Sequence, residues 1–198
     1  MTDFTTVKKN LESKRFRVST FATAEEAADY LDRSIDGVSV GIGGSVTAEQ
    51  MGLYEKLSGH NRVFWHWRPE SAEDPRREAM TADMYITSVN GMAETGELIN
   101  IDGNGNRVAA LICGPQTVYI LAGENKFVTD SDAALERVKT QACPPNARRL
   151  NQKTPCAVVG KCTDCRAPER QCRNVVWTEF VPKNRRYVMC VANEPLGY

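Results

Sequence analysis

The sequence predicts an α/β protein with a three-layer, mostly parallel sheet. Short β-branched or apolar runs alternate along the chain with segments whose apolar residues recur at helical spacing. The run TVYILAG (117–123) is apolar almost throughout, as expected of a strand that is covered on both faces. At 198 residues the chain is long enough for one domain with a substantial core. These observations together favour helices packed on both faces of one sheet.

Helices and strands alternate regularly over the first half of the chain. A helix is predicted from Phe4, with Asp3 as its N-cap, because apolar residues recur there every three or four positions. Residues 23–35 are predicted to be helical because acidic side chains fill the first turn and an apolar face follows. The other elements predicted in this half are strands at 16–21, 37–44, 62–67 and 83–90 and helices at 45–58 and 71–82.

The second half contains more strand than helix. Polar turn residues separate GELINID (96–102) from RVAALICG (107–114), which predicts a hairpin of two strands. After the strand at 117–123, a helix is predicted at 130–142, and a final pair of strands at 174–181 and 185–194. Residues 1–150 are predicted to form the α/β domain, and residues 151–198 to be a cysteine-rich segment with terminal strands that complete the same domain.

Charge and hydropathy exclude several classes of partner. Lys plus Arg and Asp plus Glu number 25 each, so no net field would attract nucleic acid. No apolar run approaches the roughly 18–20 residues that span a bilayer, and the first residues lack the apolar core of a secretory signal. A cytoplasmic protein is therefore expected. In that reducing compartment the seven cysteines favour metal sites or reactive thiols over disulfides.

Three polar loops follow predicted strands, at the edge where α/β sheets bind ligands. GIGGSVT (41–47) offers glycines and hydroxyls, NGMAETGELINIDGNGNR (90–107) is more polar than a hairpin requires, and AGENK (122–126) places a lysine at a strand end. We expect the loops to share one sheet edge and to bind a small anionic metabolite through Gly43, Gly44, Ser45, Thr47, Asn100, Asn106, Arg107, Asn125 and Lys126. The alternatives are a capped tight turn and a hairpin with a solvated tip.

Two carboxylates in the second loop are candidates for a general base, Asp102 and Glu94. A carboxylate in a dry cleft can have its pKa raised towards neutrality, where it accepts a proton from a bound ligand.

GGSVT, NIDGNGNRVAAL and GENK, in this order, resemble the lactate-utilisation (LUD) domain family. The resemblance covers nearly the whole chain and is most specific over residues 100–126. It implies a layered α/β fold similar to that of sugar-phosphate isomerases and coenzyme A transferases, with a ligand cleft at the strand ends. It also implies a role in oxidation of lactate or related hydroxy acids, with other subunits of a lactate-oxidation system as partners. It leaves the reaction itself open.

The pattern C-x5-C-x2-C-x6-C predicts a metal site formed by Cys156, Cys162, Cys165 and Cys172. Four soft thiolates suit an iron–sulfur cluster or a tetrahedral zinc ion, and the irregular spacing without a histidine favours the cluster. The alternatives are four unliganded thiols, or a metal bound only when two copies form a homodimer.

The other cysteines and the two histidines fit no such pattern. Cys113 and Cys190 are expected to be buried in apolar strands, whereas Cys143 lies near enough in sequence to approach the four. His66 lies between two tryptophans, and a structural or solvated role is favoured over acid–base chemistry; His60 is expected to be solvated.

Three functions remain open at this point. One is an enzyme or enzyme subunit of small-carboxylate metabolism. The second is an electron-transfer subunit whose cysteines hold a cluster, and the third is a non-catalytic metabolite-sensing module with a structural zinc. Iron with sulfide would distinguish the second from the third.

Overall fold

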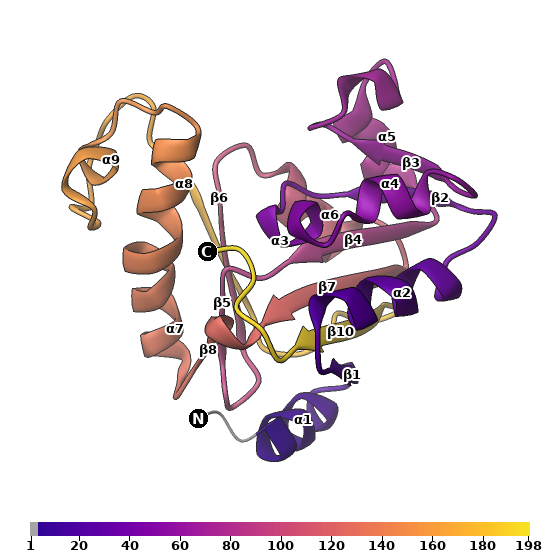
Figure 1. Ribbon diagram of the computed structural model, residues 1–198. Helices are drawn as coiled ribbons and strands as arrows, with labels where there is room; N and C mark the ends of the chain where they lie inside the picture. The colour runs from indigo at the N-terminus through magenta and orange to yellow at the C-terminus, as the bar shows by residue number, and fades with distance from the viewer. Residues whose placement is uncertain (1–3) are drawn as a thin grey trace.

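A six-stranded parallel sheet forms the centre of the molecule (Figure 1), as a computed structural model that describes residues 4–198 shows. All five pairings between neighbouring strands are parallel. The strands, in spatial order, are β1 (Arg17–Phe21), β10 (Arg186–Ala192), β7 (Thr117–Gly123), β4 (Met84–Ser88), β2 (Ser39–Ile42) and β3 (Arg62–Trp65). The predicted α/β class with a mostly parallel sheet is therefore confirmed.

Helices cover both faces of this sheet. One face is covered by α2 (Ala24–Ser34), α3 (Val46–Gln50) and α4 (Leu53–Leu57). The opposite face is covered by α1 (Phe4–Ser13), α5 (Pro75–Thr81) and α6 (Asn106–Cys113). Short polar residues start the helices where the sequence places them: the Thr23 side chain accepts a hydrogen bond from the Glu26 N–H, and Ser45 accepts one from Ala48. The predicted N-cap Asp3 lies outside the described residues.

A second, four-stranded sheet packs beside the first and was not predicted. Its strands, in spatial order, are β8 (Phe127–Val128), β5 (Gly91–Ala93), β6 (Leu98–Asp102) and β9 (Asn174–Thr178). One face of β6 contributes Leu98 to the core shared with the main sheet. The other face packs Ile99 and Ile101 against a helical column. That column, on the left in Figure 1, consists of α7 (Ser131–Arg137), a π-helical turn η3 (Val138–Ala142) and α8 (Cys143–Arg149).

Three short elements complete the chain. They are the 3₁₀ turns η1 (Pro69–Ser71) and η2 (Glu124–Lys126) and the helix α9 (Pro155–Val159).

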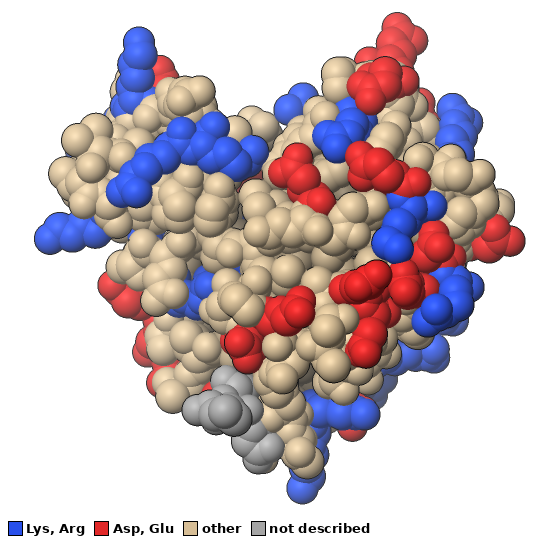
Figure 2. All heavy atoms as spheres, viewed as in Figure 1, with Lys and Arg blue, Asp and Glu red and all other residues tan. Residues whose placement is uncertain are grey.

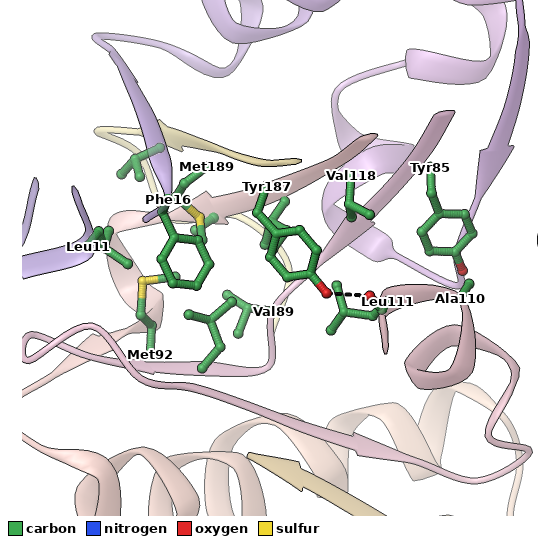
Figure 3. Packing of buried hydrophobic residues seen from close by; sticks show 14 of the residues in the cluster. Leu11, Phe16, Tyr85, Val89, Met92, Ala110, Leu111, Val118, Tyr187 and Met189 are labelled. Carbon is green, nitrogen blue, oxygen red and sulfur yellow. Dashed lines mark hydrogen bonds between the residues drawn. The ribbon is translucent and has the colours of Figure 1, made fainter. Parts of the chain in front are cut away.

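The core between the main sheet and its α1, α5 and α6 side is dense with large side chains (Figure 3). Leu11, Met92 and Met189 are fully buried there. The Tyr187 hydroxyl, also buried, donates a hydrogen bond to the Leu111 carbonyl at the end of α6. Each buried side chain of this size contributes roughly 1.5–3 kcal/mol to folding. Tyr187 thereby fixes α6, which begins at the candidate site.

The predicted hairpin is wrong in its second half. Residues 106–113 form helix α6, which begins after Gly105 in a left-handed conformation (φ 86°). An apolar run of eight residues fits either a strand or a helix by length. The burial pattern is that of a helix, because Ala110 and Leu111 are both buried and the next two residues, Ile112 and Cys113, are both exposed. Burial in a strand covered on one face would alternate from residue to residue. The expected burial of Cys113 in a strand is therefore also wrong, whereas Cys190 is buried in β10 as predicted.

Two further boundaries differ from the prediction. The helix expected at 45–58 is divided into α3 and α4 by Gly52, which has a positive φ of 61°. The last two strands do not pair with each other, because β9 joins the second sheet and β10 lies between β1 and β7.

No helix within residues 4–198 is long and apolar enough to cross a membrane. Acidic and basic side chains are interspersed over the face shown in Figure 2, with no large patch of one sign. The same view shows a notch at its upper edge.

Candidate functional site

A cleft of about 370 Å³ opens where the strands of the main sheet end, as expected for an α/β fold. The loops after β2, β3 and β4 contribute to it, and so does the turn after β6. The elements η3 and α8 form the opposite wall of the cleft. The lining residues that carry the argument below are Gly44, Ser45, Thr47, His66, Arg76, Asp102, Asn106, Arg107, Lys126, Cys143, Asn146, Arg149 and Gln171.

The loop after β2 forms one wall of the cleft. The Ser45 hydroxyl is 2.8 Å from that of Ser88, which fixes the start of α3 against the end of β4. The Thr47 side chain is buried, and its Oγ1 has no hydrogen-bond partner among the described residues. Gly44 faces the His66 ring: a Cβ on this glycine would lie 3.3 Å from Cε1. The unpartnered Thr47 hydroxyl is a polar group that a ligand can satisfy.

The turn after β6 forms the floor of the cleft and is held by Asp102. Its Oδ1 accepts hydrogen bonds from the N–H groups of Asn104 (3.0 Å) and Gly105 (2.8 Å), and its Oδ2 accepts one from Val108 (3.3 Å). Arg107 Nε lies 3.6 Å from Oδ2. Asp102 is therefore shielded from solvent, and its oxygens are occupied by hydrogen bonds to backbone N–H groups at the start of α6.

Arg107 joins the two sheets from beneath the cleft. Nη1 donates to the Asn100 side chain (2.6 Å) and to the Ser88 carbonyl (3.2 Å). Nη2 donates to the Asn90 side chain (2.9 Å) and to the Ile101 carbonyl (2.7 Å). Burial lowers the pKa of this guanidinium, and the charge of Asp102 opposes that effect. The side chain is 8% exposed, so Arg107 is a buried and fully bonded cation.

Lys126 is the second buried cation. Its ammonium donates to the carbonyl of Tyr198, and its side chain is only 2% exposed. Burial, with smaller contributions from Arg137 and Arg107, lowers its pKa to about 7. Because this pKa is close to neutral pH, a ligand that binds nearby can change the protonation state of Lys126.

The structure brings most of the predicted site residues together, but four of them do not line the cleft. Gly43 and Asn100 lie just behind the wall: a Cβ on Gly43 would be 3.2 Å from Arg107 Cγ, and Asn100 accepts from the same arginine. The Asn125 side chain instead holds the C-terminal segment by accepting from the Leu196 N–H (3.0 Å). Glu94 lies in the β5–β6 turn, at the opposite end of β6 from Asp102. Glu94 is therefore not placed to act on a ligand in the cleft.

Three cleft residues come from parts of the sequence that predicted no site. Arg76 is on α5 and Arg149 on α8, and the Arg149 guanidinium lies 4.6 Å above the Trp67 ring. His66, which follows β3, lines the cleft as well, and burial lowers its pKa to about 4, with the neighbouring Arg76 as the next cause. No local pattern marks Arg76 and Arg149, because the helices that carry them, α5 and α8, are distant in sequence. His60, by contrast, lies at the surface between Asp32 and Asp36.

The cleft is cationic. Arg76, Arg107, Lys126 and Arg149 line it, and Asp102 is the one acidic side chain among the lining residues in the described chain. Arg76 and Arg149 are exposed at its mouth, whereas Arg107 and Lys126 are buried at its floor. The arrangement suits an anion small enough to enter.

A second, smaller cavity of about 20 Å³ adjoins the cleft and is surrounded by thiols. This cysteine cavity is lined by Cys143, Cys156, Cys162, Cys165 and Cys172. The Cys143 thiol donates a hydrogen bond to the Cys172 sulfur, which lowers the pKa of Cys172 and raises that of Cys143. Within residues 4–198, however, no three His, Cys, Asp or Glu side chains are arranged as a metal site. The thiols converge without a common coordination centre.

Comparison with known proteins shows a family and a similar fold. The family model described as LUD domain matches residues 5–190. A crystal structure of a DUF162 family protein from Deinococcus radiodurans is similar in fold, with a TM-score of 0.55 and 12% sequence identity over 95% of each chain. No curated protein matches this chain.

Proposed function

This chain belongs to the LUD domain family, and we propose that it binds a small carboxylate of the lactate type in the cleft described above. The family is associated with lactate utilisation. The observation that carries the proposal is the charge of the cleft, in which four basic side chains face one carboxylate that is already hydrogen-bonded.

The cleft offers different partners to the two ends of such a ligand. Guanidinium groups form paired hydrogen bonds with carboxylates, so Arg76 and Arg149 at the mouth suit the carboxylate end. The Thr47 hydroxyl and the Lys126 ammonium at the floor suit a neighbouring hydroxyl or carbonyl oxygen. A 2-hydroxy acid satisfies both sets with one short molecule.

His66 also lines the cleft and can contact that ligand. With a pKa of about 4, the ring is uncharged at neutral pH and offers its nitrogens for hydrogen bonds to the ligand. Asp102, which the sequence analysis considered as a base, accepts three backbone N–H groups and lies beside Arg107. We therefore assign Asp102 to positioning the turn and His66 to contacting the ligand as an uncharged ring.

The first test compares two neighbouring arginines of α5. We expect Arg76→Gln to weaken binding of L-lactate about three- to tenfold, because one charged hydrogen-bonding partner is lost at the mouth of the cleft. Isothermal titration calorimetry with purified protein measures the change, and uncharged propane-1,2-diol serves as the control ligand.

Arg77→Gln is the matched control variant. Arg77 is exposed on the same helix but does not line the cleft, so its replacement should leave the affinity unchanged. Equal affinities of the wild type for lactate and for the diol, or equal effects of the two variants, would refute binding at this site.

The pH dependence of binding gives a second test. The affinity for the carboxylate should be constant below pH 7 and fall above it, because Lys126, whose pKa is about 7, loses its charge in the free protein. A bound anion favours the charged lysine, so the decline continues up to the higher pKa of the complex. Titrations from about pH 6 to about pH 9 measure this slope. Lys126→Met should remove it; a slope that persists in this variant would assign it to another group.

The cysteine cavity supports a second proposal, a thiolate-bound metal. Five soft ligands lie around one space. Cys162 Sγ accepts a hydrogen bond from the Asp164 N–H, and Cys156 Sγ is hydrogen-bonded to the Thr154 hydroxyl. The 20 Å³ cavity has room for about one water-sized species, which favours a single ion over the iron–sulfur cluster that the spacing favoured.

A zinc ion bound there would tie the cysteine-rich segment to the body of the protein, which fits a sensing module or an enzyme with a structural metal. An electron-transfer subunit, with partner subunits of a lactate-oxidation system, would instead require iron and sulfide. Anaerobic purification followed by quantitation of zinc, iron and acid-labile sulfide distinguishes these outcomes. Protein without any of the three, and unable to bind added metal, would refute the second proposal.

A further inference from the structure

The strand β9 is the outermost strand of the second sheet, and one of its edges is free. β9 pairs along its whole length with β6, and with no other strand within residues 4–198. At the opposite edge of the sheet β8 is only two residues long, whereas β9 has five. A free edge of this length exposes a row of backbone N–H and C=O groups that can pair with another strand.

β9 carries none of the features that usually keep an edge strand from pairing. Those features are prolines, bulges and charged side chains within the strand. The sequence of β9, NVVWT, contains no proline, glycine or charged residue. All five residues pair with β6 in an unbroken register, so the strand has no bulge. The edge is therefore suited to accept a further strand.

Exposed apolar side chains are concentrated on the same strand. Of the eight large apolar side chains that are exposed in the described part of the chain, three belong to β9 or to the two residues after it: Val175 (52% exposed), Trp177 (42%) and Phe180 (55%). Val175 and Trp177 lie opposite Ile101 and Ile99 of β6, so all four share one face of the sheet. The helical column covers the two isoleucines but leaves the valine and the tryptophan in solvent.

The sequence around β9 is complementary to itself. In an antiparallel pair of two copies centred on Val176, each Val175 lies opposite the Trp177 of the other copy, which is a favourable pairing of an aromatic with a β-branched side chain. Arg173, just before the strand, then lies opposite Glu179, just after it. Both are exposed, and Glu179 forms no salt bridge with another described residue. A shift by two residues in either direction separates the charges and places Trp177 opposite Arg173 or opposite itself.

We propose that two copies of this chain form a two-fold symmetric dimer in which their β9 strands pair antiparallel about Val176. The two four-stranded sheets thereby become one continuous sheet. The helical columns of both copies lie on the same face of that sheet, and the two valine–tryptophan pairs fill the space between them. Because Asn174 of β9 lies opposite Asp102, the dimer also fixes the strand beside the floor of the cleft. The pairing does not depend on which ligand the cleft binds.

Sedimentation equilibrium of the reduced protein tests the dimer, with the reductant present to exclude disulfide-linked species. We expect the mass to rise from 22.0 kDa towards twice that value between about 1 and about 100 µM protein. Trp177→Lys should weaken the association by about tenfold or more, because it removes both apolar pairs and places a charge in each. Val158→Lys is the matched control: this valine is 84% exposed on α9, outside the strand pair, and its replacement should leave the mass curve unchanged.

A charge exchange tests the register. Arg173→Glu alone and Glu179→Arg alone each place like charges opposite each other, so each variant should dimerise more weakly than wild type. An equimolar mixture of the two variants restores opposite charges at both positions and should form the mixed dimer in preference to either homodimer. Native mass spectrometry with one variant labelled with nitrogen-15 separates the three dimers, and recovery in the mixture shows that both variants are folded.

Three results would overturn the inference. Wild type that stays at 22.0 kDa over the whole range would refute the dimer and leave the edge to a strand of a different protein. A dimer that Trp177→Lys leaves intact would assign the association to another surface. A mixture with no more than the statistical share of mixed dimers would refute the pairing about Val176.

Discussion

Replacing Arg107 with methionine is expected to lower the free energy of unfolding by about 3–5 kcal/mol. Methionine fills similar space but donates no hydrogen bond, so the Ser88 and Ile101 carbonyls and two asparagine side chains lose their donor. Asp102, 9% exposed, also loses its nearest cation. Breaking one partner of a buried pair costs far more than the intact pair contributes, because the remaining charge stays desolvated. Chemical denaturation in urea measures the change.

Arg33→Met is the control for this change, since Arg33 lies in the last turn of α2 at the surface and its replacement should cost less than about 0.5 kcal/mol. The loss in free energy of unfolding for Asp102→Asn should lie between these two values, because the amide oxygen of asparagine can still accept hydrogen bonds from part of the turn. A loss for Arg107→Met no larger than that for Arg33→Met would contradict the view that Arg107 joins the two sheets.

The main sheet could be predicted from local pattern, but the second sheet could not. Buried strands such as β7 are apolar throughout, and the helices between them carry their own capping residues, so each element is specified within a short window. β5 and β8 are three and two residues long and carry no period of their own. The segment 107–114 shows the ambiguity: its burial as a helix depends on the Tyr187 hydrogen bond and on packing against the sheet.

The candidate site, like the fold, could be predicted only in part from the sequence. Polar loops after strands were visible in the sequence, and the structure places Ser45, Thr47, Arg107 and Lys126 at one cleft. Glu94 and Asp102 are both carboxylates of the same polar loop, so the sequence did not distinguish them. Because β5 and β6 pair as an antiparallel hairpin, Glu94 lies in the turn before β6, whereas Asp102 lies at the end of β6. Arg76, Arg149 and Cys143 lie on helices whose sequences are ordinary. Only the packing of α5 and η3–α8 around the strand ends gives them a role.

Gly41→Ala is expected to affect folding and binding together. A Cβ on this residue of β2 would lie 2.3 Å from the Ala79 carbonyl oxygen and 2.7 Å from the Ala79 Cα, both parts of the α5 backbone. Backbone atoms cannot rotate away, so α5 must shift from the sheet, at a cost of about 3 kcal/mol or more. α5 also carries Arg76 into the cleft. We therefore expect a lower free energy of unfolding and a weaker affinity for lactate in the protein that remains folded.

Gly59→Ala separates this effect from the general cost of replacing a glycine. The nearest atom to a Cβ on Gly59 is the Lys56 carbonyl oxygen at 3.9 Å, an ordinary contact, so we expect stability and affinity close to wild type. The two measurements on Gly41→Ala also separate the consequences of the shift. Loss of stability with an unchanged lactate affinity would show that the sheet accommodates the methyl group without moving Arg76, and would argue against α5 as the element that sets the mouth of the cleft.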